Sequence, residues 1–534
     1  MVIRLNKNVH VIVTLIYLLL PIIIFSFGWL KLLFLLITLF LIFGSILIII
    51  RPTRVFRSLF CQPLPILNRQ ILRRISTSPF LPAFILLAMW LALSGIGGVG
   101  HQNRDYITAH NALLKDLILQ EWPIRLNTTS INTPYVYYLA YYLPAGLVGK
   151  VLTSWKAANL AMFIWAGFGV YLAFGWFIKT SKVNINGKAL PVFILACFFC
   201  FASGMDTVGY YTLQQHSFNS TQHMEFWADL FQFSSQTTLL YWVPQHTIAA
   251  WLLIGMIVNS IENQEYVKYL GIASAATLLW SPFGVLGSIA YLFFIIYRCL
   301  FRHLSLRVID VQSTFLTITA LWIFLITASF LASNSFNYPI TFTVKELAPI
   351  KDYIIRLIEF WLIEFALLAI LVIGYLSISE KPVKNSGTQV PKNSQVGIFI
   401  DGISTNLDIK TTQFYVFSIA FSTLLALPLF KFGYNNDLVM RASIPSLFIF
   451  WSFIAKVVID PIKHYRVLNR LFYVFIILFL LIGTYTSISE ILRSVKHYQI
   501  GPPPIEIVTD NQGIGKLMQR AGSDDAFFFK YFAK

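Results

Sequence analysis

The sequence predicts an all-α, polytopic transmembrane helix bundle, and three observations support this fold class. Of the 534 residues, 57% are hydrophobic and only 12% are charged, and the mean hydropathy is +0.70. A soluble protein of this size needs far more polar surface. Apolar runs long enough to cross a bilayer recur along the whole chain. Finally, Lys and Arg gather in short loops between these runs, where such residues set the orientation of membrane proteins.

The net charge of +17 therefore has a membrane explanation. In a soluble protein it would suggest nucleic acid as a partner, but here the cations lie mostly between apolar runs. The segment 51–74 holds six Arg and no acid. Smaller basic clusters lie within 298–310 and 461–470. We expect these loops and the N-terminus on the cytoplasmic side, with no nucleic acid partner.

About thirteen spans are predicted. We place them near residues 10–28, 30–50, 79–98, 157–178, 189–203, 245–260, 268–282, 283–299, 311–332, 354–378, 412–429, 443–460 and 471–488. The two segments on either side of Ser281-Pro282 are short, which is also compatible with a hairpin that barely crosses.

This topology makes residues 1–488 one transmembrane domain and 489–534 a short non-cytoplasmic tail. The four loops on the outer side are 99–156, 204–244, 333–353 and 430–442. One interpretation decides the pattern. We treat 134–153 as an amphipathic helix on the outer surface, because its tyrosines suit the interface and its Pro144-Ala-Gly146 break argues against a straight span. If it crossed, the loops after it would change sides.

The first outer loop carries an acid close to the membrane. Asp105 follows the third span by a few residues, and the pattern from 105 to 119 is helical. A carboxylate partly removed from water at the membrane edge is suited to act as a general base or to bind a cation. His110 lies on the same predicted helix and is a candidate substrate or phosphate ligand. The alternative is that Asp105 only caps this helix.

The second outer loop combines acids, imidazoles, amides and aromatic rings, with no Lys or Arg. Asp206 and Glu225 are its candidate catalytic acids, while His223 and Trp227 are candidate substrate-binding residues. This mixture suits sugars, whose rings stack on aromatic side chains and whose hydroxyls bond to amides and carboxylates. Anchoring at the interface would explain the Trp and Tyr residues, but not the acids, His and Gln.

Candidate phosphate ligands lie at two further places. His246 begins the sixth span near the outer surface, where it could donate to a phosphate oxygen; a packed, satisfied histidine is the alternative. In the fourth outer loop, Lys431 and Arg441 could clamp a phosphate. Asp437 lies four residues before Arg441 on one helix face, which predicts an ion pair that orients the arginine.

At this point the layout resembles the GT-C superfamily of membrane glycosyltransferases. Asp105 opens a large outer loop, which continues through the helical stretch HNALLKDL, the turn Trp122-Pro123 and the surface helix TPYVYYL. That helix looks like the proline-tyrosine segment of protein mannosyltransferases and aminoarabinose transferases. Asp206 stands where such enzymes often carry a second acid. The similarity covers residues 79–300. This chain departs from the pattern in two ways, because two spans precede the acidic loop and Asp105 has no adjacent acid.

The resemblance implies an inverting glycosyltransferase, acting at the outer face of a bacterial inner or plasma membrane. A polyprenyl-phosphate carrier would present the sugar, and the acceptor would be a glycan, a lipid or a protein. Asp105 would deprotonate the acceptor hydroxyl, and Asp206 or Glu225 would bind the acceptor, assist the base or hold a divalent cation such as Mg or Mn. The cationic residues named above would stabilise the leaving phosphate.

Two other functions are compatible with the sequence. A transporter or flippase of a lipid-linked glycan would use the same cations without a base, and it would carry ionisable residues in mid-span, of which Glu364 is the best example. A polysaccharide polymerase would use similar chemistry to the transferase. The sequence shows no internal repeat of the kind found in many transporters.

Overall fold

The computed structural model describes most of the chain. The described residues are 7–50, 78–127, 132–214, 223–301, 310–336, 339–346, 349–379, 412–433, 436–460, 466–501 and 519–534. The basic segment 51–74 and most of 379–411 lie outside them. The described part is mostly helical, with two small two-stranded sheets.

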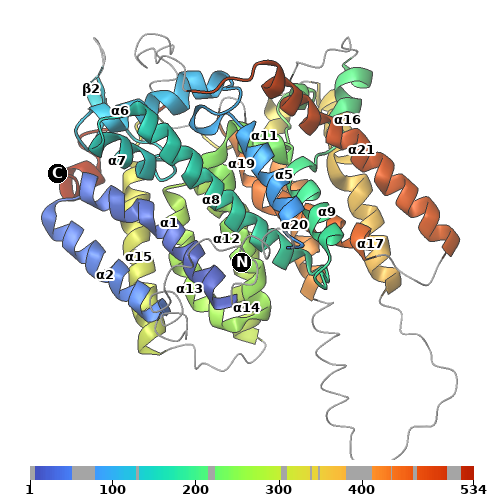
Figure 1. The fold of residues 1–534 in the computed structure, drawn as a ribbon, viewed down its shortest axis with the longest axis horizontal. Coiled ribbons are helices and arrows are strands. Elements are labelled where there is room, and N and C mark those ends of the chain that lie inside the picture. The colour runs from blue at the N-terminus through green and yellow to red at the C-terminus, as the bar shows by residue number, and fades with distance from the viewer. Residues whose placement is uncertain are drawn as a thin grey trace, which may run out of the picture.

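The longer helices form the body of the molecule (Figure 1). They are α1 (Lys7–Trp29), α2 (Leu32–Ile50), α5 (Leu81–Ala92), α6 (Asn111–Leu119), α7 (Leu143–Val151), α8 (Trp155–Ser181), α9 (Ala189–Phe201), α12 (Pro244–Glu262), α13 (Val267–Leu278), α14 (Pro282–Phe301), α15 (Val311–Ala332), α16 (Ile350–Trp361), α17 (Leu367–Ser379), α20 (Ile444–Ile459) and α21 (Arg466–Lys496). Short helices include α10 (Asp206–Val208), α11 (Gln236–Trp242) and α19 (Asp437–Ala442). The sheets pair β1 (Arg125–Asn127) with β2 (Asn132–Pro134), and β3 (Thr341–Phe342) with β4 (Phe430–Lys431).

Fewer helices than predicted have the length and composition of a membrane span. Within the described residues eight helices qualify, or nine if the bent pair 189–201 and 206–213 is one span. The prediction of thirteen spans is therefore not confirmed. The other predicted spans do fall on helices, but α5, α13 and α20 are short, and α12 carries several polar residues.

Helix α12 lies at the centre of the bundle and packs against α8, α13, α14 and α20. Nearly every residue of this helix is buried, including Gln245, His246 and Asn259. Gly255 lets α8 approach closely, because a Cβ at this position would overlap the side chain of Trp176. Small residues at helix contacts have this role in membrane bundles. The close packing fixes the position of His246 at the start of α12.

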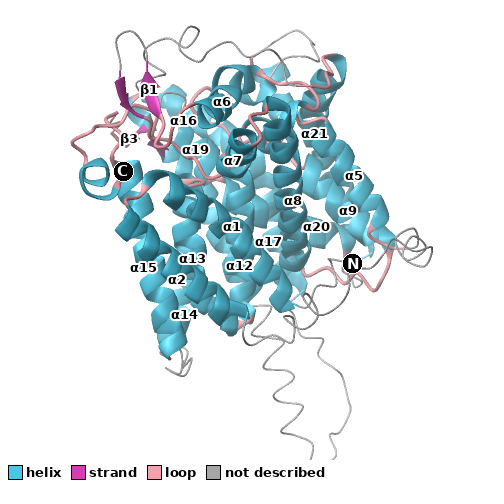
Figure 2. Cartoon of the chain, turned by 60° about the vertical axis from the view of Figure 1, so that its left-hand side comes forward, coloured by secondary structure: helices cyan, strands magenta, loops and turns pink. Residues whose placement is uncertain are grey.

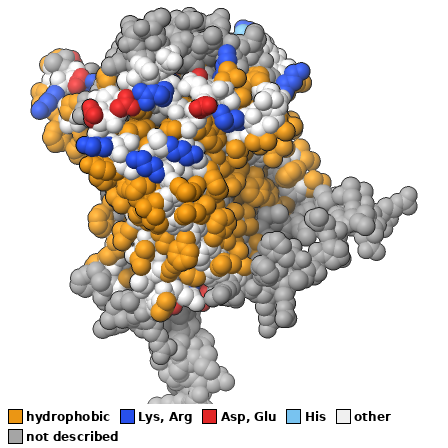
Figure 3. Space-filling model, turned by 90° about the vertical axis from the view of Figure 1, so that its left-hand side faces the viewer, with side chains coloured by type: hydrophobic (Ala, Val, Ile, Leu, Met, Phe, Trp, Pro, Cys, Tyr) orange, Lys and Arg blue, Asp and Glu red, His pale blue; other side chains and the backbone are white. Residues whose placement is uncertain are grey.

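Most loops of the described residues are concentrated at one end of the bundle, which we call the loop end. Figure 2 shows α6, α7, α16 and α19 together with both sheets at this end, while the described N-terminal residues of α1 lie toward the opposite end. Polar and charged side chains form a belt at the loop end above a broad apolar surface (Figure 3). An apolar girdle of this kind is typical of proteins that lie in a bilayer.

The segment 134–153 differs from the predicted surface helix. Only α7 is helical, and its nine residues span about 14 Å, too short to cross a bilayer. Tyr135, Tyr141 and Tyr142 are almost fully buried instead of lying at the membrane interface. The tyrosine run is part of the core beneath the loop end, which explains why so many large rings occur together.

The C-terminal residues 519–534 are an integral part of the fold and not a separate tail. Ala521 pairs with Tyr135, Gly522 with Asn334, and Ala533 with Leu30 through isolated β-bridges. Phe528 is fully buried against Phe25 and Phe330. In addition, α21 runs on to Lys496, beyond the predicted end of the last span at 488. The last residues therefore join α1, α15 and the tyrosine segment at the loop end.

Candidate active site

The helix that carries Asp105 is capped by its neighbour. The side-chain oxygen of Asn103 accepts hydrogen bonds from the backbone N–H groups of Asp105 (3.0 Å) and Tyr106 (3.3 Å). Asp105 itself makes no capping bond. The capping role that could have explained this acid is therefore performed by Asn103. A π-helical turn from Tyr106 to His110 then shifts the register before α6, so the predicted helix 105–119 is not one regular α-helix.

His110 positions this helix and has no free ring nitrogen. Its Nε2 lies 3.1 Å from the carbonyl oxygen of Trp242, which only accepts, so Nε2 carries the proton. Nδ1 then accepts from the hydroxyl of Tyr142. Burial lowers the pKa of His110 to about 4, against the opposing effect of the Asp105 charge. In this geometry the neutral ring of His110 has both nitrogens engaged and offers no free donor, so its phosphate-binding role stays a prediction without support from these contacts.

His246 presents an unused ring nitrogen. Its Nδ1 lies 2.8 Å from Ser281 Oγ, which also accepts from the backbone N–H of Gly284 at 3.0 Å. The hydroxyl proton of Ser281 is thus available for Nδ1, which leaves the ring proton on Nε2. This Nε2 is buried and has no hydrogen-bond partner among the described residues. The satisfied histidine that was the alternative is not what the structure contains.

Arg441 and His246 both pack against the ring of Phe283. The Arg441 guanidinium is stacked 5.7 Å from the ring centre of Phe283, and that ring packs against His246 with centroids 5.9 Å apart. Asp437 accepts from Arg441 at 3.0 Å, as the spacing of four residues predicts. The Nε–H of Arg441 is buried and has no partner among the described residues.

Asp105 belongs to the same group of charges. It stabilises the cationic form of Arg441, together with Asp437 and Tyr138. His246 and Arg441 also interact electrostatically. We call Asp105, His246, Asp437 and Arg441 the arginine cluster. Three loop-end segments far apart in sequence thus contribute a carboxylate, an arginine and an unpaired imidazole N–H to one electrostatically coupled group.

Asp206 lies in a second group, which we call the acid cluster: Asp206, Glu225 and Glu364. Asp206 follows the break after α9, accepts from Ser203 Oγ at 3.1 Å, and is hydrogen-bonded to Glu364. A hydrogen bond between two carboxyl groups requires a proton on one of them. Gly204 makes this contact possible, because any side chain there would collide with the Glu364 carboxyl. The charged neighbours of Asp206 are acids, whereas Asp105 interacts electrostatically with the cation Arg441.

The remaining predicted residues of the second loop have structural partners. The Glu225 carboxylate accepts from the backbone N–H of Ser235 at 2.9 Å and from Gln232 at 3.0 Å. Trp227 is fully buried, and its indole N–H donates to Glu364 at 3.1 Å. A sugar cannot stack on a ring enclosed in this way. In this structure both side chains hold the loop together, and their predicted roles toward a substrate stay predictions.

His223 forms a third group with residues that the sequence did not bring together. Its Nδ1 lies 2.8 Å from Glu490, which also accepts from Trp242 at 3.0 Å and pairs with Arg493 at 2.9 Å. Burial disfavours the charged ring, but the hydrogen bond that His223 donates to Glu490 and the negative charges of Glu490 and Glu225 outweigh it, so the pKa of His223 is raised. We interpret this group as a set of hydrogen bonds and ion pairs that fixes the second loop to α21.

The two remaining predictions concern Lys431 as a phosphate ligand and a possible divalent cation. Lys431 pairs with Glu346 at 2.9 Å, beside the pairing of β3 and β4, and is thus engaged in a structural ion pair. Across the described ranges, no three His, Cys, Asp or Glu side chains are placed to hold a metal ion.

Several residues of these groups were missed by sequence reasoning. Tyr142 and Ser281 fix the two histidines through hydrogen bonds, and Glu490 binds His223 from α21. Arg520, from the C-terminal segment, stacks 5.0 Å over Tyr137 and acts electrostatically on His110. In the sequence Arg520 is one cation in a mixed polar segment, and only its packing against the tyrosine run in the structure relates it to this site.

Comparison with known proteins found no similar protein. No protein-family model, no curated protein and no solved structure matches the chain.

Proposed function

We propose that this protein is a membrane glycosyltransferase that moves a sugar from a polyprenyl-phosphate carrier to an acceptor hydroxyl at the loop end, which we take as the non-cytoplasmic face. The single observation that carries the proposal is the pair of unsatisfied donors in the arginine cluster, Arg441 Nε and His246 Nε2. A buried donor without a partner costs about 1–3 kcal/mol. Such a cost is typical of a site that a ligand completes.

The chemistry of the two donors favours an anion. Arg441 remains charged, and its guanidinium is matched to phosphate oxygens. An imidazole N–H beside it adds a second, differently directed hydrogen bond. Together they would stabilise the negative charge that develops on the phosphate as the sugar leaves. Asp437 holds Arg441 in place, because their ion pair is short and partly buried.

Asp105 supplies the other half of the reaction. In the proposed mechanism its carboxylate accepts the proton of the acceptor hydroxyl as the oxygen attacks the anomeric carbon, and the bond from that carbon to the phosphate oxygen breaks. The electron pair goes to the phosphate beside Arg441 and His246. Asn103 supports this role, because it caps the helix and leaves Asp105 available.

The test is transfer from radiolabelled polyprenyl-phosphate hexoses and pentoses to membrane acceptors by the full chain in proteoliposomes. Asp105→Asn keeps the shape of the side chain and removes the base, so we expect transfer to fall about 10²–10⁴-fold. Asp116→Asn, on the same helical segment, is the control and should retain most of the activity. Wild-type transfer by the Asp105→Asn protein would falsify the assignment of the base.

A transporter or flippase of a lipid-linked glycan is the second candidate. One observation favours it: the hydrogen-bonded acids Asp206 and Glu364 lie where α9 bends by 40° into the next segment and where a π-helical turn interrupts a candidate span. Ionisable residues at helix breaks in membranes often mark transport pathways. Movement of intact labelled carrier across the bilayer, without sugar transfer and dependent on Glu364, would replace the first proposal with this one.

A further inference from the structure

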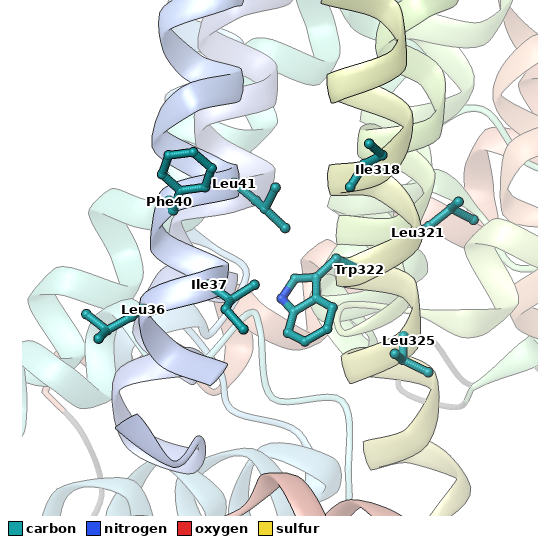
Figure 4. Close-up of a pocket in the computed structure, with 8 residues that line it drawn as sticks. All are labelled: Leu36, Ile37, Phe40, Leu41, Ile318, Leu321, Trp322 and Leu325. Atoms are coloured by element: carbon teal, nitrogen blue, oxygen red, sulfur yellow. The ribbon is translucent and has the colours of Figure 1, made fainter. Parts of the chain in front are cut away.

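An apolar groove runs between α2 and α15, away from the clusters described above. Figure 4 shows Leu36 and Phe40 on one wall and Leu321, Trp322 and Leu325 on the other. The groove has a volume of about 740 Å³, and every residue that lines it is apolar. Both helices are candidate membrane spans. The groove therefore has the composition that a hydrocarbon chain requires.

The C-terminal segment closes the groove toward the loop end. The ring of Phe532 packs against Trp322 at a centroid distance of 6.2 Å and against Phe34 at 4.7 Å. The backbone N–H of Lys31 donates to the carbonyl of Phe532 at 2.9 Å. The turn between α1 and α2 and the last residues of the chain thus form one edge above the groove.

Three lysines lie on this edge. Lys31 Nζ donates to the carbonyls of Lys530 and Tyr531, at 3.2 and 3.1 Å, and Lys534 Nζ donates to the carbonyl of Phe27 at 2.7 Å. All three lysines are exposed. Carbonyl oxygens hold the ammonium groups of Lys31 and Lys534 in place without cancelling their charge. Asp524, an acid of the same segment, is engaged by Arg125 at 2.9 Å.

The spacing between the lysines and the groove matches a lipid. Lys31 precedes Leu36 by five residues, which corresponds to about 7–8 Å along the helix axis. Figure 3 shows Lys and Arg side chains in a row at the upper edge of the apolar surface on this side of the molecule. A cationic edge directly above an apolar groove is complementary to an anionic headgroup with a hydrocarbon chain below it.

We propose that the groove binds one anionic phospholipid of the bilayer, with an acyl chain between α2 and α15 and its phosphate at Lys31, Lys530 and Lys534. The occupant is a bilayer phospholipid because the groove opens sideways along two membrane helices. The inference is independent of the proposed sugar transfer, and it assigns the C-terminal segment a role in lipid binding.

The experiment uses the full chain in nanodiscs of equal phosphatidylglycerol and phosphatidylcholine, followed by native mass spectrometry of the lipid that stays bound. We expect the wild-type protein to retain one phosphatidylglycerol. The double variant K530Q/K534Q should lower the preference for phosphatidylglycerol about 10–30-fold, because each lysine near an anionic headgroup contributes favourably. The matched control K345Q/K351Q removes two exposed charges from the same end of the molecule and should change the preference less than about threefold.

A second pair of variants tests the groove itself. Leu321→Trp fills it and should reduce retained phospholipid whatever the headgroup, whereas Leu47→Trp, on an exposed position of α2 outside the groove, should not. Equal retention of both phospholipids by the wild-type protein would overturn the proposal. Retention by Leu321→Trp at the wild-type level would also overturn it. Displacement of phosphatidylglycerol by an equimolar polyprenyl phosphate would contradict the stated occupant.

Discussion

The arginine cluster and the acid cluster both hold charged side chains in the protein interior, but they differ in how their polar atoms are satisfied. In the acid cluster, Glu225 accepts from two donors, and Asp206 and Glu364 are bonded to each other and to Ser203 and Trp227. In the arginine cluster, two buried N–H groups have no partner within the described part of the chain.

This difference indicates that the acid cluster stabilises the fold, whereas the arginine cluster is suited to bind a ligand. A satisfied buried network holds elements together and gives a unique arrangement. A buried donor left without a partner lowers the stability of the free protein, and binding of an acceptor to this donor restores the lost free energy. The two second-loop acids that the sequence offers as catalytic candidates, Asp206 and Glu225, are thus in the more structural group.

The largest expected effect comes from Arg441→Gln, which attacks the unsatisfied cluster. We expect sugar transfer to fall about 10²–10³-fold, or roughly 3–4 kcal/mol, because the leaving phosphate loses its charged partner. The free energy of unfolding should change little, since Asp437 is partly exposed and can be solvated. Transfer rates and denaturation in the same detergent check both parts.

The control for Arg441→Gln is Lys431→Gln. Lys431 is a cation of the same predicted patch, but it is bound to Glu346. Its loss should reduce transfer by less than about tenfold. If the two variants lost equal activity, the distinction between the two cations would fail.

The next largest effect is on stability and comes from Glu225→Ala. The backbone N–H of Ser235 and the amide of Gln232 would lose their acceptor in a buried place, which costs about 3 kcal/mol in total. Chemical denaturation measures this loss. Glu265→Ala, at an exposed position, should change stability by less than about 0.5 kcal/mol. A stable, inactive Glu225→Ala protein would instead make Glu225 a catalytic residue and break the comparison.

Sequence patterns predicted the helices well because they depend on local hydrophobicity. The pairing of Asp437 with Arg441 was also predicted, since it needs only a spacing of four residues on one helix. The predicted number of thirteen spans is not confirmed, since eight or nine segments of the described residues have the length and composition of a span. Helices such as α12 and α13 are apolar because they are buried in the bundle, and hydropathy alone does not separate a buried core helix from a lipid-facing span.

The partners of the predicted site residues could not be read from the sequence. Both ring nitrogens of His110 are engaged by Tyr142 and Trp242, which lie 32 and 132 residues away, and burial keeps the ring neutral. His223 is bound by Glu490, 267 residues away. Whether a histidine is free or engaged depends on such long-range packing, and no local pattern encodes it. The same reason explains why Glu225 looked available and is not.

The two engaged histidines should give opposite dependences of stability on pH. The folded-state pKa of His110 is lowered from 6.5 to about 4, so its contribution is present above pH 6.5 and is lost as the pH falls toward 4. The pKa of His223 is raised, so its contribution is present below pH 6.5 and is lost as the pH rises through the folded value.

Unfolding free energies across this pH range check the two signs. His110→Gln should flatten the curve on the acidic side only, and His223→Gln on the alkaline side only. Each variant is the control for the other, because both remove one buried imidazole from the loop end. Flattening on the same side in both variants would contradict the assigned protonation states.

The smallest expected effect is the coupling energy of the ion pair Lys431–Glu346. Its side chains are 20% and 37% exposed, and pairs of this exposure contribute about 0–1 kcal/mol because solvent screens the charges. A double-mutant cycle with Lys431→Gln and Glu346→Gln measures it in the unfolding free energy. The matching cycle on Asp437 and Arg441 should give a similar value for stability but a much larger one for sugar transfer. That contrast follows if Asp437 acts by holding Arg441 toward a phosphate, and equal coupling in both measurements would reduce Asp437–Arg441 to an ordinary helix ion pair.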